Sequence, residues 1–127
     1  MLMARILIAE DEEALGAMCG RALAAVGHAV EITRDGSEAL DVLTRENGRF
    51  DLLLTDVRMP IMDGIALALA AARDFPELTI LLMTGYADQR ERAQGLDALI
   101  HDVIAKPFSV ATLRAAVDEA LAVKARG

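Results

Sequence analysis

The sequence predicts an α/β fold, a doubly wound parallel sheet in which each of five strands is followed by a helix. Apolar segments of four or five residues recur between longer stretches whose apolar residues return every three or four positions. Most of the short segments lack polar alternation, which is typical of parallel strands covered on both faces. The chain of 127 residues has the usual length of one domain, and no repeat or linker interrupts it. We therefore expect a single domain over residues 1–127.

Five apolar segments predict the strands of this sheet. They are RILIA (Arg5–Ala9), AVEIT (Ala29–Thr33), DLLLT (Asp51–Thr55), ILLMT (Ile80–Thr84) and DVIA (Asp102–Ala105). The second segment alternates polar and apolar residues, so we expect it to form an edge of the sheet.

The longer stretches between the strands predict the helices. In the first helix, Leu15, Cys19 and Leu23 share one apolar face, and Gly27 ends the helix. Cys19 is therefore expected in the core rather than as a redox switch. The other predicted helices are Gly36–Asn47, Gly64–Asp74, a short and loosely held Ala87–Gly95, and a last helix after the N-cap Ser109.

The composition restricts the classes of partner. Hydrophobic residues make up 54% of the chain and aromatic residues only 3%, so the core must be mainly aliphatic. A net charge of -7 without a cluster of Lys or Arg argues against binding to nucleic acid or to an anionic membrane. No apolar run approaches the roughly 20 residues of a membrane span. With one cysteine and no secretory signal, the chain is expected to be cytoplasmic, with a protein or a small cation as partner.

Five polar residues follow or end the predicted strands at their carboxyl ends, where doubly wound sheets bind ligands. They are Glu10, Asp11, Asp56, Thr84 and Lys106. Three carboxylates at one edge repel one another unless a cation intervenes, and Mg²⁺ prefers such hard oxygen ligands. Zinc is not expected, because His28 and His101 lack ligand spacing; we expect both to be strand-flanking surface residues without a role.

With magnesium balancing the charge, Asp56 could act as a nucleophile toward a phosphoryl group and form an aspartyl phosphate. Lys106 would then offset charge on the phosphoryl oxygens, and the Thr84 hydroxyl would donate a hydrogen bond to one of them. The alternative is that each acidic residue only caps a helix or ends a strand at the surface. The combination of five such residues at one edge favours the chemical interpretation.

Four motifs occur in an order that is found in one protein family. They are AEDE (Ala9–Glu12), LLLTDVRMPIMDG (Leu52–Gly64), LLMTGYA (Leu81–Ala87) and VIAKPF (Val103–Phe108). Through these motifs the whole chain resembles the receiver domain of two-component response regulators. The resemblance implies a flavodoxin-like (βα)5 receiver fold with strand order 2-1-3-4-5, and a cis peptide bond between Lys106 and Pro107.

The same resemblance implies that Asp56 is the phosphoacceptor, supported by Thr84 and Lys106. The implied magnesium ligands are Asp11, Asp56 and the backbone carbonyl of Arg58, with Glu10 contributing through water. Such a domain is not an enzyme toward other molecules, although it would catalyse its own phosphorylation and dephosphorylation. Since no linker follows the last helix, we expect a single-domain receiver over residues 1–127 without an output domain.

Within this family, the stretch from Arg58 to Phe108 is similar to the CpdR-type receivers of alphaproteobacterial cell-cycle control. That similarity implies phosphorylation by a histidine phosphotransferase that is itself supplied by a hybrid histidine kinase. It also implies that the unphosphorylated form assists substrate delivery to the ClpXP protease, with ClpX as partner. A single-domain receiver with another target, such as a kinase or a motor, is the alternative.

One position departs from the family pattern. Receivers usually carry Tyr, Phe or His three residues before the lysine, and here that residue is Val103. An aromatic rotamer therefore cannot report phosphorylation, and we expect residues 85–95 to change instead, read by the partner together with the last strand and helix. Arg58 and Tyr86 are expected either to flank the site and restrict attacking water or to be exposed loop residues.

Three other functions fit the sequence less well. A magnesium-dependent phosphatase with an aspartate nucleophile usually has a second aspartate two residues later, where this chain has Arg58. A flavin-binding module would need a phosphate loop after the first strand, where the acidic EDEEA (Glu10–Ala14) would repel phosphate. An interaction domain that no longer accepts phosphate would not be expected to retain Asp56, Thr84 and Lys106.

Overall fold

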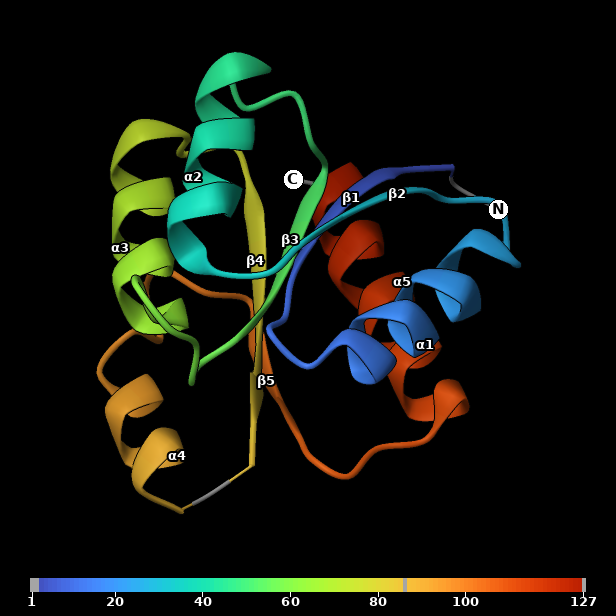
Figure 1. Cartoon of the computed structure of the whole chain (residues 1–127). Helices are drawn as coiled ribbons and strands as arrows, with labels where there is room; N and C mark the ends of the chain where they lie inside the picture. The colour runs from blue at the N-terminus through green and yellow to red at the C-terminus, as the bar shows by residue number, and fades with distance from the viewer. Residues whose placement is uncertain (1–2, 86, 127) are drawn as a thin grey trace.

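The structure, a computed structural model of the chain, describes residues 3–85 and 87–126, without the side chains of 87–90 and 126. It contains one five-stranded parallel sheet in the order β2-β1-β3-β4-β5, which confirms the predicted fold class and strand order (Figure 1). The strands are β1 (Arg5–Ala9), β2 (Ala29–Thr33), β3 (Leu52–Asp56), β4 (Thr79–Thr84) and β5 (Asp102–Ala105). As expected, β2 lies at an edge.

A helix follows each strand. The helices are α1 (Glu13–Ala24), α2 (Gly36–Arg45), α3 (Gly64–Asp74), α4 (Ala87–Gln94) and α5 (Val110–Arg126). Figure 1 shows α1 and α5 on one face of the sheet and α2, α3 and α4 on the other. None of the helices in the described part of the chain has the length and apolar character that crossing a membrane requires.

The sheet has a separate apolar layer on each face. In β1, Ile6 and Ile8 pack on the side of α1 and α5, whereas Leu7 packs on the opposite side. Strand β3 repeats this arrangement with Leu54 on the first side and Leu53 on the second. Because alternate side chains of a strand point to opposite faces, both must be apolar when both faces are covered. This explains the unbroken apolar segments of the sequence.

Short polar side chains begin several helices. Asp35 accepts a hydrogen bond from the Glu38 amide at the start of α2 (2.8 Å). Ser109 accepts one from the Thr112 amide before α5 (3.0 Å), which confirms the predicted cap. Gly27 has a φ of 101°, which a residue with a side chain rarely adopts, and it ends the α1 region as expected.

The prediction that His28 lies at the surface is wrong, because only 5% of the residue is exposed. Its Nδ1 accepts a hydrogen bond from the backbone amide of Ala4, just before β1 (3.1 Å). That amide is buried and needs an acceptor, which a residue 24 positions away supplies. His101 is half-buried and its Nε2 lies 3.4 Å from a carboxylate oxygen of Glu119. Neither histidine belongs to the described cluster of acidic residues.

Cys19 should react slowly with thiol reagents in the folded protein. The residue is fully buried in the layer between the sheet and α1 and α5, as the sequence predicts. Burial raises the pKa of its thiol to about 11, so almost none of it is thiolate near neutral pH. The rate of modification by a chromogenic disulfide reagent, compared with the rate in concentrated urea, measures this protection. Similar rates in the two conditions would show that Cys19 is accessible.

Candidate functional site

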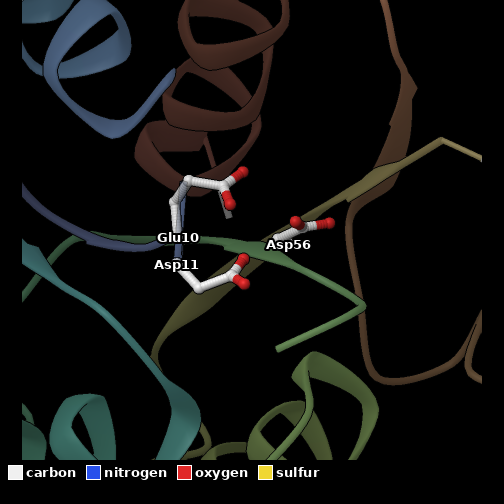
Figure 2. Close-up of side chains that lie close together, drawn as sticks. All are labelled: Glu10, Asp11 and Asp56. Atoms are coloured by element: carbon white, nitrogen blue, oxygen red, sulfur yellow. The ribbon is translucent and has the colours of Figure 1, made fainter. Parts of the chain in front are cut away.

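The carboxyl edge of the sheet brings together the residues that the sequence selects. Glu10 and Asp11 follow β1, and Asp56 ends β3, the strand beside it. One carboxylate oxygen from each of these three residues lies within 4.8 Å of the others. Figure 2 shows the three carboxylates gathered at this edge. The site is therefore assembled by parallel strand pairing, which places the ends of neighbouring strands side by side.

Asp56 is held rigidly, and only 5% of the residue is exposed. Its strand lies between β1 and β4, and the next amide, that of Val57, donates to the carbonyl of Met83 in β4 (3.2 Å). The chain then loops back, because the Gly64 amide at the start of α3 donates to the Val57 carbonyl (2.8 Å). This return brings Gly64 so close that a Cβ there would overlap the backbone oxygen of Asp56.

Lys106 joins the fifth strand to the acidic cluster. Its Nζ donates to Oδ2 of Asp56 at 2.8 Å and to Oε1 of Glu10 at 3.0 Å. Burial alone would lower the pKa of Lys106, but these two hydrogen bonds outweigh it and raise the pKa. Its amide also donates to the Thr84 carbonyl at the end of β4 (2.7 Å). The Lys106–Pro107 peptide is cis, as the resemblance implies.

Glu10 is a buried carboxyl group with a raised pKa. Its pKa is raised from 4.5 to about 7, mainly by burial; a hydrogen bond from the Glu12 amide opposes the rise, and the charge of Asp56 adds to it. The hydrogen bond and the charge of Lys106 also oppose this rise. Without a cation, the buried site therefore favours the neutral, protonated form of Glu10.

This perturbation predicts a pH dependence of stability in the absence of divalent cations. The folded protein retains a proton on Glu10 that the unfolded chain has already lost above about pH 4.5. Its contribution to the free energy of unfolding should therefore fall as the pH rises from about 4.5 to about 7, and then level off. Urea titrations at several pH values compare the wild type with Glu10→Gln, which cannot ionise. Equal pH dependence in the two proteins would contradict the expected shift.

Thr84 adds a buried hydroxyl group to the same edge of the sheet, and the described part of the chain does not hydrogen-bond to it. The residue is only 1% exposed, and its Oγ1 finds no hydrogen-bond partner in the described part of the chain. A buried hydroxyl in this state costs free energy, which makes Thr84 a candidate functional residue.

The other residues that the sequence singled out near the site are Arg58, Tyr86 and Val103. Arg58 is exposed and lines the open cavity of about 700 Å³ that also contains Asp11, Asp56 and Lys106. Tyr86 lies outside the described residues. Val103 is half-buried on the face of the sheet that α4 covers.

Two features near the site were missed at the level of sequence. Asp63 caps α3 by accepting from the Ala66 amide (2.9 Å), and its other oxygen pairs with Arg92 of α4 (2.7 Å). Partial burial opposes the change, but these contacts lower the pKa of Asp63. The second feature is the close approach of Gly64 to Asp56. A cap followed by glycine in MDG (Met62–Gly64) was the available signal for both.

The cluster has the properties that a hard divalent cation needs. Its donors are carboxylate oxygens, two of them from buried residues and one, on Asp11, from an exposed residue that leaves the site open. Nitrogen or sulfur ligands are absent from the described cluster, which fits Mg²⁺ better than zinc.

The chain is similar to response regulators in sequence. A profile described as the response regulator receiver domain matches residues 6–118. Response regulator MprA of Mycobacterium sp. (strain KMS) is 37% identical over 111 residues, which are 87% of this chain and 47% of that protein. MprA of Mycobacterium avium (strain 104) is also 37% identical over 111 residues. The chain thus spans about half the length of the curated relatives it matches.

Solved structures agree with the sequence match. A CheY-like response regulator receiver domain protein from Methanospirillum hungatei JF-1 is 29% identical with a TM-score of 0.88, and the match covers 98% of each chain. Response regulator protein TrrA from Thermotoga maritima, solved in complex with Mg(2+)-BeF, is 25% identical with a TM-score of 0.81, over 94% of this chain and 100% of that one. From the fold, the acidic edge of the sheet and these matches, we conclude that this chain belongs to the response regulator receiver domain family.

Proposed function

We propose that this domain is a phosphorylation switch of a two-component phosphorelay, with Asp56 as the phosphoacceptor. The observation that carries the proposal is the position of Asp56 between two other carboxylates and the ammonium group of Lys106, 2.8 Å away. A strand end holds this carboxylate in place, while the cavity leaves it open to a donor. The donor is the phosphohistidine of a histidine phosphotransferase or of a hybrid histidine kinase.

The proposed reaction is a phosphoryl transfer. A carboxylate oxygen of Asp56 attacks phosphorus, an O–P bond forms, and the P–N bond to the donor imidazole breaks with its electron pair going to nitrogen. Lys106 balances charge on the transferred oxygens, and the free hydroxyl of Thr84 donates to one of them. The reverse loss, by attack of water on phosphorus, restores the carboxylate. The domain thus acts on itself and not on other substrates.

A bound Mg²⁺ would supply positive charge beside the carboxylates and the phosphoryl oxygens. We assign its ligands to Asp11, Asp56 and the backbone carbonyl of Arg58, with Glu10 acting through water. The three clustered carboxylates support this assignment, and so does the Mg(2+)-BeF complex of the related TrrA.

We further propose a CpdR-like output. The domain would act as a single-domain receiver over residues 1–127 in the cytoplasm, and its unphosphorylated form would assist delivery of substrates to ClpXP in cell-cycle control. The similarity of residues 58–108 to CpdR-type receivers supports this role. We assign the partner surface to α4, β5 and α5, because Thr84 lies at the start of the loop into α4 and beside β5.

Phosphorylation should weaken binding to ClpX. With Mg²⁺ and beryllofluoride, which imitates the aspartyl phosphate, the wild-type protein should bind immobilised ClpX more weakly. Under the same conditions the rate of hydrogen exchange of the backbone amides of α4 should change. Asp56→Asn should bind ClpX equally with and without beryllofluoride, which makes it the control. Tighter binding of the beryllofluoride form would reverse the proposed direction, and binding to ClpX in neither state would exclude this output while leaving phosphoryl transfer intact.

A further inference from the structure

A second hollow lies between α4 and β5, apart from the acidic site. It has a volume of about 220 Å³. Its lining residues are Ala93, Gln94, Asp97, Val103 and Ala105. The space is open because Ala93 of α4 and Ala105 of β5 have small side chains. No aromatic side chain is among the described residues that line it.

The hollow lies directly beside the proposed switch residue. Val103 packs on the α4 face of the sheet, and Ile104 packs on the opposite face, so Ala105 points the same way as Val103. Ala105 pairs in register with Thr84, whose hydroxyl has no partner among described residues. Leu82 of β4 faces the same side of the sheet as Val103. Because side chains alternate along a strand, Thr84, two residues after Leu82, faces that side too.

The volume of the hollow suits one side chain. Pockets for small-molecule ligands usually measure about 300–1,000 Å³, so this hollow is too small to be one. A cavity of about 150 Å³ is known to hold a benzene ring, so one aromatic ring fits here.

Among the described residues that line the hollow, one is charged, and it is acidic. This residue is Asp97, which follows α4 and is exposed. The neighbouring cation Arg92 is paired with Asp63 at 2.7 Å. The whole chain carries a net charge of -7. A binding segment therefore gains from a positive side chain next to the one that enters the hollow.

We propose that this hollow is a docking site for one aromatic side chain of a protein partner, with a lysine or arginine beside it that contacts Asp97. The inference rests on the proposed function, because the partner is the protein whose binding depends on the phosphorylation state of Asp56. Movement of Thr84 toward a phosphoryl group would alter the strand pairing at Ala105, one wall of the hollow. A ring supplied by the partner would then occupy the space beside Val103.

A synthetic peptide with one phenylalanine between two pairs of lysines tests this proposal. Titrated into the ¹⁵N-labelled full chain, it should shift the amide signals of Ala93, Gln94, Val103 and Ala105. A peptide with alanine in place of phenylalanine should bind at least about tenfold more weakly. The Val103→Phe variant, whose ring fills the hollow from within, should lose a similar factor in affinity for the phenylalanine peptide. Asp97→Asn should also weaken binding, and this effect should depend on the salt concentration.

Leu69→Phe is the matched control, because Leu69 is exposed on α3, outside both the hollow and the partner surface, and this variant should bind the peptide as the wild type does. Equal binding of the alanine peptide, or shifts confined to the residues around Asp11, would overturn the proposal. Unchanged binding by Val103→Phe would do the same. Labelling of Asp56 by acetyl phosphate is measured in the same samples. Failure of labelling in the wild type would contradict the proposed function without affecting the docking result.

Discussion

Asp56→Asn should abolish incorporation of a phosphoryl group from acetyl phosphate or from a phosphorylated histidine phosphotransferase. The amide is nearly the same size as the carboxylate but is a far weaker nucleophile, so the fold should persist while the reaction stops. In the wild type Lys106 also donates to Glu10 at 3.0 Å, and the substitution does not remove this partner. Phosphate-affinity electrophoresis or mass spectrometry of the intact protein measures the incorporation.

The matched control is Asp74→Asn, which removes an exposed carboxylate at the end of α3, away from the acidic cluster. This variant should be labelled as the wild type is. Substantial labelling of Asp56→Asn, at wild-type rate or yield, would mean that another residue accepts the phosphoryl group.

Gly64→Ala should strongly destabilise the domain. A Cβ at this position would overlap the backbone oxygen of Asp56 and press against Val57. These are backbone atoms of a central strand, which cannot move aside as the end of a flexible side chain can. We expect a loss of about 3 kcal/mol or more in the free energy of unfolding. The surviving folded fraction should also show disturbed signals around Asp56, because the same loop positions its carboxylate.

Gly95→Ala provides the comparison for this loss. Gly95 follows α4, has no atom of the described residues within 4 Å of its ideal Cβ, and does not adopt a left-handed backbone. Its substitution should change the free energy of unfolding by no more than about 0.5 kcal/mol. Urea denaturation of the two variants measures both values. A similar small effect of the two substitutions would contradict the close approach between Gly64 and Asp56.

The sequence predicted the parts of this molecule that depend on local pattern. Apolar segments such as Leu52–Leu54 identified strands covered on both faces, and helical spacing placed Cys19 in the core. The acidic edge followed from the rule that parallel strands end together, which brought Asp11 and Asp56 to one place.

Features that depend on contacts between distant segments were not predicted. The burial of His28 follows from its hydrogen bond to the Ala4 amide, and the spacing of apolar residues carries no sign of such a pair. The Arg92–Asp63 ion pair likewise depends on where α4 lies against the start of α3. The two contacts of Lys106 were not predicted, because the sequence indicated a contact with the phosphoryl oxygens and not with Asp56 or Glu10. Such contacts become visible only when the packing of the elements is known.

The most direct test of the account is to find which residue carries the phosphoryl group in the wild-type protein. Borohydride reduces an aspartyl phosphate to homoserine, so the reduced residue can be located by peptide mass spectrometry after labelling with Mg²⁺ and a phosphoryl donor. The account predicts homoserine at position 56 and at no other aspartate, and none when the donor is omitted. Homoserine at another position, or its absence from position 56 in protein shown to be labelled, would contradict the assignment of Asp56.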